Sequence, residues 1–150
     1  MRVIRRAMFE TNSSSTHSIT IDRKWPPSKM GKIHVEPDGV CYVYPGEFGW
    51  GVEEFRDAAA KASYCYTFAT TVAAEEEGKA LLDRLAKLIR EQTGCSEVKF
   101  CVLRREGEEN RGYIDHQSKD VAREAFENDE TLRDFIFNPD SILRIDNDNH

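Results

Sequence analysis

The chain has 150 residues, of which 39% are hydrophobic and 32% charged, and its 27 Asp and Glu outnumber its 21 Lys and Arg to give a formal net charge of −6. This balance excludes a disordered, collagen-like or coiled-coil chain, and the length is that of one domain able to bury about two thirds of its unfolded surface. No stretch approaches the roughly 18 consecutive apolar residues of a membrane span, and no apolar segment follows the basic start, so we expect a cytoplasmic protein with reduced cysteines.

The first third of the chain predicts short strands. Residues 2–9 and 19–22 alternate between apolar and polar side chains, and we expect them to pair as two strands joined by the small polar loop 11–18. Two further short strands are expected at 33–35 and 40–44, because a Pro-Asp-Gly sequence between them is typical of a turn.

The apolar spacing then changes to three and four, which indicates helices. It predicts one helix over about 52–66 and a second over about 79–93, where a leucine and isoleucine stripe is flanked by Lys and Arg and ends at Gly94. A third helical region is expected over 119–137.

Short strands are expected between and after these helices, at about 98–102, 112–114 and 142–145. The sequence therefore predicts a single α+β domain over 1–150. It would have an antiparallel or mixed sheet of five to seven short strands with about three helices packed on it.

The polar loop at 11–18 is the segment least explained by folding alone. Small hydroxyl and amide side chains bond to nearby backbone in turns, which makes a structural loop, or a loop ordered by a partner, one interpretation. The same groups form a cradle of donors for phosphate or carboxylate oxygens, to which the neighbouring Arg2, Arg5 and Arg6 would add charge. The loop contains no glycine, so it is neither a Walker A loop nor a Rossmann turn. The candidate ligand-binding residues are Thr11, Asn12, Ser13, Ser14, Ser15, Thr16, Ser18, Gln117 and Ser118.

Two histidines lie next to these polar segments. His17 is within the first segment, and His116 follows a predicted strand directly before a predicted helix, where ligand groups often gather. Asp115 would orient the imidazole of His116 only if the backbone turns between them. If the protein is an enzyme, His116, His17 and Asp115 are the catalytic candidates; surface histidines without such a role are the alternative.

Metal and nucleic-acid sites are less well supported by the sequence. No cofactor is predicted; a divalent cation held by Asp115, Asp146, Asp148 and His116 is an open alternative, and its identity is unknown. The cysteines lack a Cys-x-x-Cys motif, which argues against zinc. The aromatic residues between 42 and 68 lie in an acidic part of the chain, so we do not expect direct nucleic-acid binding and assign them to the core or to a pocket wall.

Three segments also carry a resemblance. Phe9-Glu10-Thr11-Asn12-Ser13-Ser14-Ser15-Thr16-His17-Ser18, Tyr113-Ile114-Asp115-His116-Gln117-Ser118 and Asp146-Asn147-Asp148-Asn149 resemble a family of small, functionally uncharacterised proteins met in phages, prophages and Firmicutes genomes. The resemblance covers nearly the whole chain. It implies a setting in bacterial mobile elements and brings no reaction with it.

The main hypothesis is that the fold brings the polar segments together into a pocket for a phosphorylated or nucleotide-like small molecule. A phosphoester hydrolase using the same pocket is one alternative. The other is an inhibitor of a host anti-phage defence protein, because the last 45 residues, 106–150, hold thirteen acidic and five basic residues. That alternative predicts an exposed acidic face made by Glu124, Glu127, Asp129, Glu130 and Asp134. The oligomeric state does not follow from the sequence.

Overall fold

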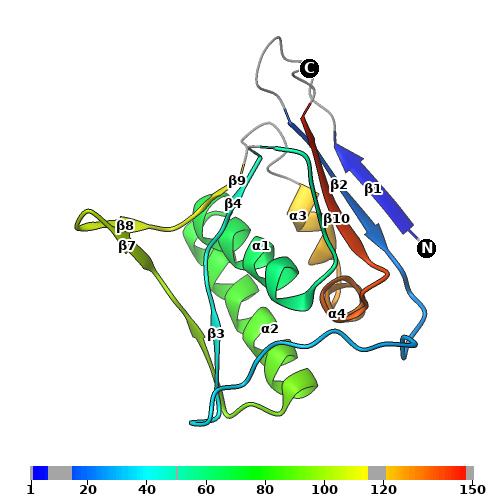
Figure 1. The fold of residues 1–150 in the computed structure, drawn as a ribbon, viewed down its shortest axis with the longest axis horizontal. Helices are drawn as coiled ribbons and strands as arrows, with labels where there is room; N and C mark the ends of the chain where they lie inside the picture. The colour runs from blue at the N-terminus through cyan, green and yellow to red at the C-terminus, as the bar shows by residue number, and fades with distance from the viewer. Residues whose placement is uncertain (1, 7–14, 50, 115–120, 148–150) are drawn as a thin grey trace.

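We describe the fold from a computed structural model of the chain. The structure describes residues 2–6, 15–49, 51–114 and 121–147. These form an α+β protein, which confirms the predicted fold class. Figure 1 shows its main layers, a twisted antiparallel sheet along one side and a group of helices packed against that sheet's inner face.

The sheet has four strands in the order β1–β2–β10–β5. β1 (Arg2–Arg6) and β2 (Ser15–Ile21) are antiparallel neighbours, as the alternation predicts, and β10 (Ile142–Asn147) pairs with the other edge of β2. β5 (Glu53–Phe55) closes the far side against β10. Every second residue of the two central strands enters the core, and these are fully buried: Ile19, Ile21, Leu143 and Ile145.

Four helices in the described ranges build the other layer. α1 (Ala58–Thr71) lies at the centre and packs against α2 (Glu75–Thr93), α3 (Val121–Ala125) and α4 (Asp129–Phe137). The Asp57 carboxylate accepts a hydrogen bond of 3.0 Å from the Ala60 amide and caps α1. α2 ends at Gly94, whose φ of 75° is the left-handed conformation favoured at helix C-termini.

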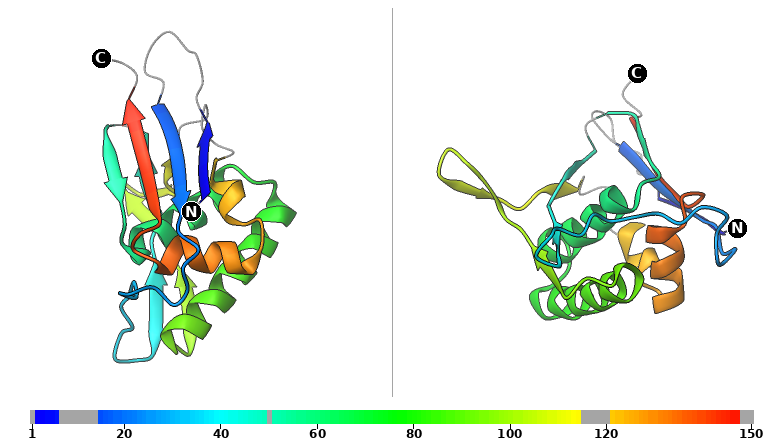
Figure 2. Two further views of the ribbon diagram at one scale, coloured as in Figure 1. Left: turned by 90° about the vertical axis from the view of Figure 1, so that its right-hand side faces the viewer. Right: turned by 60° about the horizontal axis from the view of Figure 1, so that its bottom comes forward.

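Three two-stranded pairs complete the fold. β3 (Val40–Val43) runs parallel to β6 (Glu97–Phe100), and β4 (Glu47–Phe48) runs parallel to β9 (Tyr113–Ile114). β7 (Leu103–Arg105) and β8 (Glu108–Asn110) form an antiparallel hairpin. Figure 2 shows this hairpin projecting away from the helices.

The structure corrects several boundaries. The segment 52–66 is divided between strand β5 and the first half of α1, because Glu53–Phe55 pairs with β10 before the Asp57 cap starts the helix. Residues 33–35 form no strand, although Ile33 is buried. The region 119–137 contains two helices, since Asn128 caps a new one by accepting from the Thr131 amide at 2.8 Å. The strands form one four-stranded sheet and separate pairs instead of a single larger sheet.

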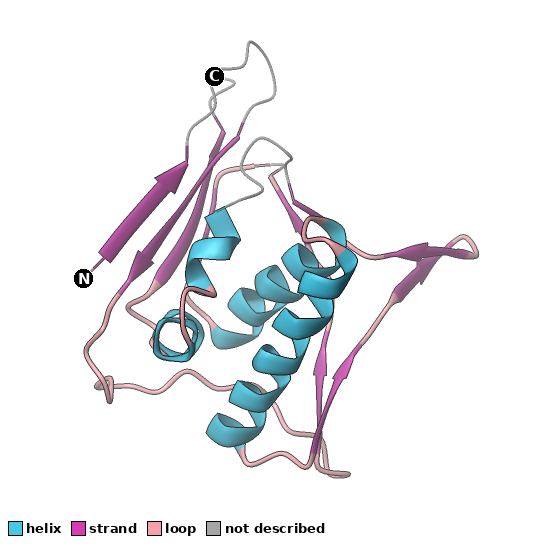
Figure 3. Cartoon of the chain, turned by 180° about the vertical axis from the view of Figure 1, so that it is seen from behind, coloured by secondary structure: helices cyan, strands magenta, loops and turns pink. Residues whose placement is uncertain are grey.

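The core lies between the sheet and α1. Its largest fully buried apolar side chains come from α1, α2, α4 and the two central strands, and the helices contribute Tyr64, Phe68, Leu85, Leu132 and Phe135. The four cysteines are free thiols. No helix in the described ranges combines the length and the apolar character needed to cross a membrane. Figure 3, seen from behind, shows α1 and α2 crossing between the sheet and the β3–β6 pair.

Candidate functional site

The predicted site residues divide into two groups. Thr16, His17, Ser18 and Asp146 are described, and Ser15 is described in its backbone. The others lie outside the described residues: Thr11, Asn12, Ser13, Ser14, Asp115, His116, Gln117, Ser118 and Asp148. The residues to which the polar segments are attached are described: Arg6 and Ser15 on either side of the first segment, and Ile114 and Val121 on either side of the second.

The end of the predicted loop is a strand. β2 begins at Ser15, so residues 15–18 belong to the sheet, where successive side chains point to opposite faces. His17 is on the inner face and fully buried, whereas Thr16 and Ser18 lie on the outer face. The structure thus separates the imidazole of His17 from its two hydroxyl neighbours.

His17 is a hydrogen-bonded residue of the core. Its Nδ1 lies 3.0 Å from the hydroxyl oxygen of Tyr64, and the two ring centroids are 5.9 Å apart. Burial raises the pKa of Tyr64 well above its usual value, so the phenol keeps its proton. Phe48 packs edge-on against the same tyrosine at 4.9 Å between centroids. The imidazole is closed off from solvent and satisfied by an internal partner.

The outer face of the sheet carries a polar row across three strands. Ser18 is paired with Arg5 on β1 and with Arg144 on β10, and Arg144 is paired in turn with Glu54 on β5. The Arg144 guanidinium donates to both carboxylate oxygens of Asp146, at 3.0 and 3.3 Å. These bonds raise the pKa of Arg144 above its already high usual value, so the group is always charged.

Exposure decides which groups of this row a ligand could reach. The Arg144 side chain is 52% exposed and Thr16 is half-buried, while Ser18 retains 8% of its surface and lies between its neighbours. Figure 2 (left) shows the sheet from this outer side. Among its described side chains, the row therefore offers the accessible guanidinium of Arg144 with hydroxyl groups beside it.

The attachment points of the polar segments lie at one end of the molecule. Arg6 ends β1 opposite His17, and Ser15 starts β2 opposite Asn147. The end of β9 is linked to the same region, because Ile114 is paired with Phe48, which packs on the tyrosine bonded to His17. Figure 1 shows these strand ends together at the upper end of the fold. The two polar segments are thus anchored close to each other.

A buried lysine is a feature that the sequence did not indicate. The Lys61 side chain is fully buried, and its ammonium donates to the carbonyl oxygens of Asn138 at 2.9 Å and Ser141 at 2.8 Å. Burial lowers its pKa from 10.5 to about 7. Because both partners are backbone groups near the end of α4, Lys61 ties that end to α1.

The prediction of an exposed acidic face on α3 and α4 is wrong for Asp134. This carboxylate is buried and accepts from Arg133 at 3.0 Å, with Arg23 at 3.9 Å. Asp129 is exposed but is bonded to Arg84 at 3.1 Å. The other predicted members stay at the surface, with Glu127, Asp129 and Glu130 exposed and Glu124 partly exposed.

Metal ligands do not cluster in the part of the chain that the structure describes: no group of three or more His, Cys, Asp or Glu could hold an ion there. Comparisons with models of known protein families, with curated proteins and with solved structures found no match.

Proposed function

We propose that the protein binds a small phosphorylated or nucleotide-like molecule at the end of the sheet where β2 begins. One observation carries the proposal: Ser18, beside Thr16, is paired in one cross-strand row with Arg144 and with the position of Arg5. In this proposal Arg144 and Thr16 contact phosphate oxygens, and the predicted residues of 11–15 and 115–118, anchored nearby, complete the pocket.

The chemistry of the row supports an anionic ligand. A guanidinium is planar and forms two parallel hydrogen bonds with a phosphate, and hydroxyl groups add neutral donors. Asp146 already holds the Arg144 guanidinium by two bonds, so a ligand would compete with that carboxylate for the exposed side of the group. This competition predicts moderate affinity and a dependence on salt concentration.

We propose binding in preference to hydrolysis, because the imidazole of His17 faces the core and already bonds to Tyr64. A hydrolase would depend on His116 and Asp115 instead. The resemblance noted above adds a setting in phages and other mobile elements, and we place the protein in the cytoplasm.

Thermal-shift and calorimetric titrations with nucleoside di- and triphosphates, sugar phosphates and inorganic phosphate test the proposal, each with and without Mg²⁺. A ligand at a hundred times its dissociation constant stabilises the fold by about 2.7 kcal/mol. Arg144→Gln should weaken binding about tenfold, since a charge-assisted bond contributes about 1.5 kcal/mol or more.

Arg84→Gln provides the matched control, because it also removes a carboxylate-bonded arginine, on α2. The unphosphorylated nucleosides provide the ligand control. If no phosphorylated compound binds, or if both arginine variants lose affinity equally, the proposed site is wrong. Product formation that is abolished by His116→Ala would instead favour the hydrolase alternative.

A further inference from the structure

The hairpin β7–β8 is an arm with unpaired edges. Its two strands pair with each other and project from the body of the protein (Figures 1 and 2). Glu106 and Gly107 form its turn with φ values of 53° and 81°, the type I′ geometry in which Asn-Gly is preferred. A two-stranded ribbon leaves one edge of each strand open for hydrogen bonding with another chain.

A groove runs along the open edge of β8. It has a volume of about 400 Å³ and lies between Glu47 of β4 and residues 106–112 of the arm. Residues from both side-chain faces of β8 line it, including Glu108 and Glu109, so the groove follows the edge of the strand and not one of its faces.

The backbone of β8 is arranged to receive a strand at this edge. After a two-residue turn the first pair, Arg105 with Glu108, exchanges hydrogen bonds within the hairpin. The next pair, Arg104 with Glu109, is of the kind whose N–H and C=O groups point outward. Glu109 therefore directs its backbone donor and acceptor toward the groove.

The walls of the groove are acidic. Four carboxylates and one guanidinium line it, and that guanidinium, from Arg111, is bonded to Glu109 at 3.2 Å. Among the side chains that the structure describes, Glu47, Glu106 and Glu108 make no ion pair. Within the described side chains, the groove thus presents three carboxylates without an ion-pair partner.

Apolar side chains surround the base of the arm. The exposed fractions are 43% for Val102, 41% for Leu103 and 37% for Tyr113, and Tyr44 is also exposed. They are four of the six large hydrophobic residues counted as exposed in the described ranges. An open strand edge, an acidic groove and exposed apolar groups occur together here.

We propose that the open edge of β8 binds an extended segment of a partner protein as an added strand, with Lys or Arg side chains of that segment facing Glu47, Glu106 and Glu108. The apolar side chains at the arm's base would contact apolar residues of the same segment. A second copy pairing β8 with β8 would bring like charges together, which disfavours it. The site is separate from the anion site on the sheet, which lies on the opposite side of Figure 1.

A short fluorescent peptide of alternating lysine and valine tests this proposal on the full chain. Fluorescence anisotropy should show saturable binding that weakens with salt, and amide NMR shifts should be centred on 108–110. Two comparison peptides isolate the two contributions to binding: one with glutamate in place of lysine, and one methylated at alternate backbone nitrogens, which removes the donors needed for strand pairing. Both should bind at least about fivefold more weakly.

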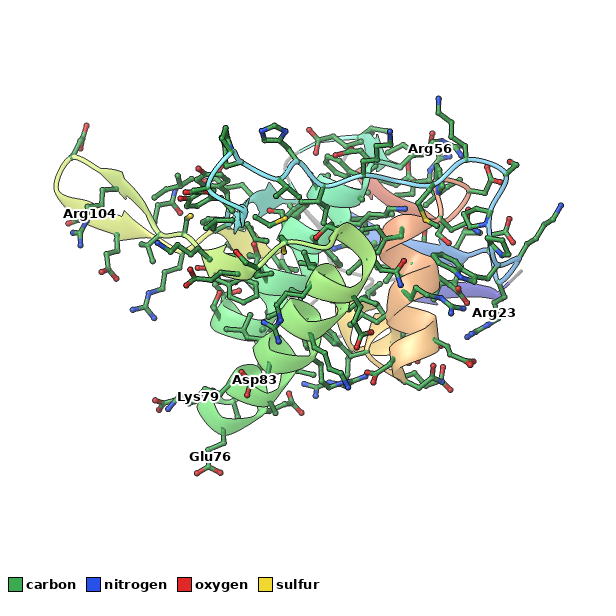
Figure 4. The ribbon with its side chains drawn as sticks, turned by 90° about the horizontal axis from the view of Figure 1, so that it is seen from below. Arg23, Arg56, Glu76, Lys79, Asp83 and Arg104 are labelled. Carbon is green, nitrogen blue, oxygen red and sulfur yellow. The ribbon has the colours of Figure 1, made fainter. Side chains whose placement is uncertain are left out.

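The variant Glu106→Gln with Glu108→Gln should weaken binding of the lysine peptide about fivefold, because it removes two of the three carboxylates that would face the lysine side chains. Glu76→Gln with Asp83→Asn is the matched control, since it removes the same charge from exposed positions on α2, labelled in Figure 4. Equal loss in both variants, equal binding of the methylated peptide, or self-association of the chain through the arm in light scattering would overturn the proposal.

Discussion

Lys61→Met should lower the stability of the protein and change how that stability depends on pH. Methionine keeps the length of the side chain and removes the charge and the three donors. In the native protein the ammonium donates to the carbonyl oxygens of Asn138 and Ser141, in a site without solvent exposure. Each carbonyl left without its donor costs about 1–3 kcal/mol, which the removal of a buried amine partly offsets. We expect a net loss of about 2 kcal/mol in the free energy of unfolding at neutral pH.

The pH dependence gives a sharper test than this net value. The pKa of Lys61 is about 7 in the folded protein and 10.5 when unperturbed, so between these values unfolding takes up a proton. Stability therefore increases with pH across this window, by up to about 1.4 kcal/mol per unit from this one group. Burial raises the pKa of Cys65 and Cys41, whose thiols lose protons on unfolding near pH 9 and change stability in the opposite direction.

Urea denaturation followed by circular dichroism measures both proteins between about pH 7 and 8.5, below the cysteine range. Because the thiols are common to both, the difference between wild type and Lys61→Met isolates the lysine. The wild-type advantage should increase by roughly 1–1.5 kcal/mol over this interval. Parallel pH profiles for the two proteins would show that Lys61 is not desolvated, and the assignment would be refuted.

Three further substitutions test the packing around α1 and α2. Tyr64→Phe removes the hydroxyl group bonded to His17 and should cost about 1–3 kcal/mol in urea denaturation; an unchanged midpoint would mean that the bond is absent. Gly78→Ala places a Cβ against the carbonyl oxygen of Ala69, so the two helices must separate, at a cost of about 3 kcal/mol. Gly94→Ala has open space but a φ of 75°, and should cost only about 1 kcal/mol. Equal losses at the two glycines would contradict this distinction between crowding and backbone strain.

The helix predicted over 79–93 shows what sequence periodicity supplies. One face of α2 is apolar and the other charged, so the stripe alone indicates a helix, and Gly94 marks its end. The apolar spacing does not predict its first turn, Glu75–Gly78, because three consecutive glutamates interrupt the apolar pattern there. α1 was harder to delimit, since it is buried on nearly every side and carries little polar contrast.

The start of β2 could have been found by a stricter use of alternation. His17, Ile19 and Ile21 are buried at every second position, and extending the pattern from the two isoleucines back to the histidine predicts a strand through Ser15–Ile21. The hydroxyl-rich composition favoured a loop instead. The alternation of buried and exposed residues is a better guide than composition here. β2 has partner strands on both edges, and these strands form hydrogen bonds with its backbone whatever its side chains are.

Lys61 could not be identified from sequence. A lysine in a helix is normally read as a solvated flank, and its two acceptors are backbone carbonyls almost eighty residues away, at Asn138 and Ser141. Only the tertiary packing of α4 on α1 brings them together. The same holds for the Cys41 thiol, which lies 3.7 Å from the Thr93 hydroxyl across the β3–α2 contact.

The distribution of ion pairs shows which acidic residues of 106–150 are paired within the protein. Two carboxylates of α4 have internal partners: Asp134 is paired with Arg133 and Arg23, and Asp129 with Arg84. Glu106 and Glu108, on the projecting arm, have no such partner among the described side chains. Glu106 also lies in the turn with a positive φ of 53°, a strained conformation for a residue other than glycine. Intramolecular attraction thus accounts for the charge of Asp129 and Asp134 and leaves the charge on the arm unexplained. We therefore expect an acidic interaction surface along β8 and the turn before it, where Glu106 and Glu108 lie.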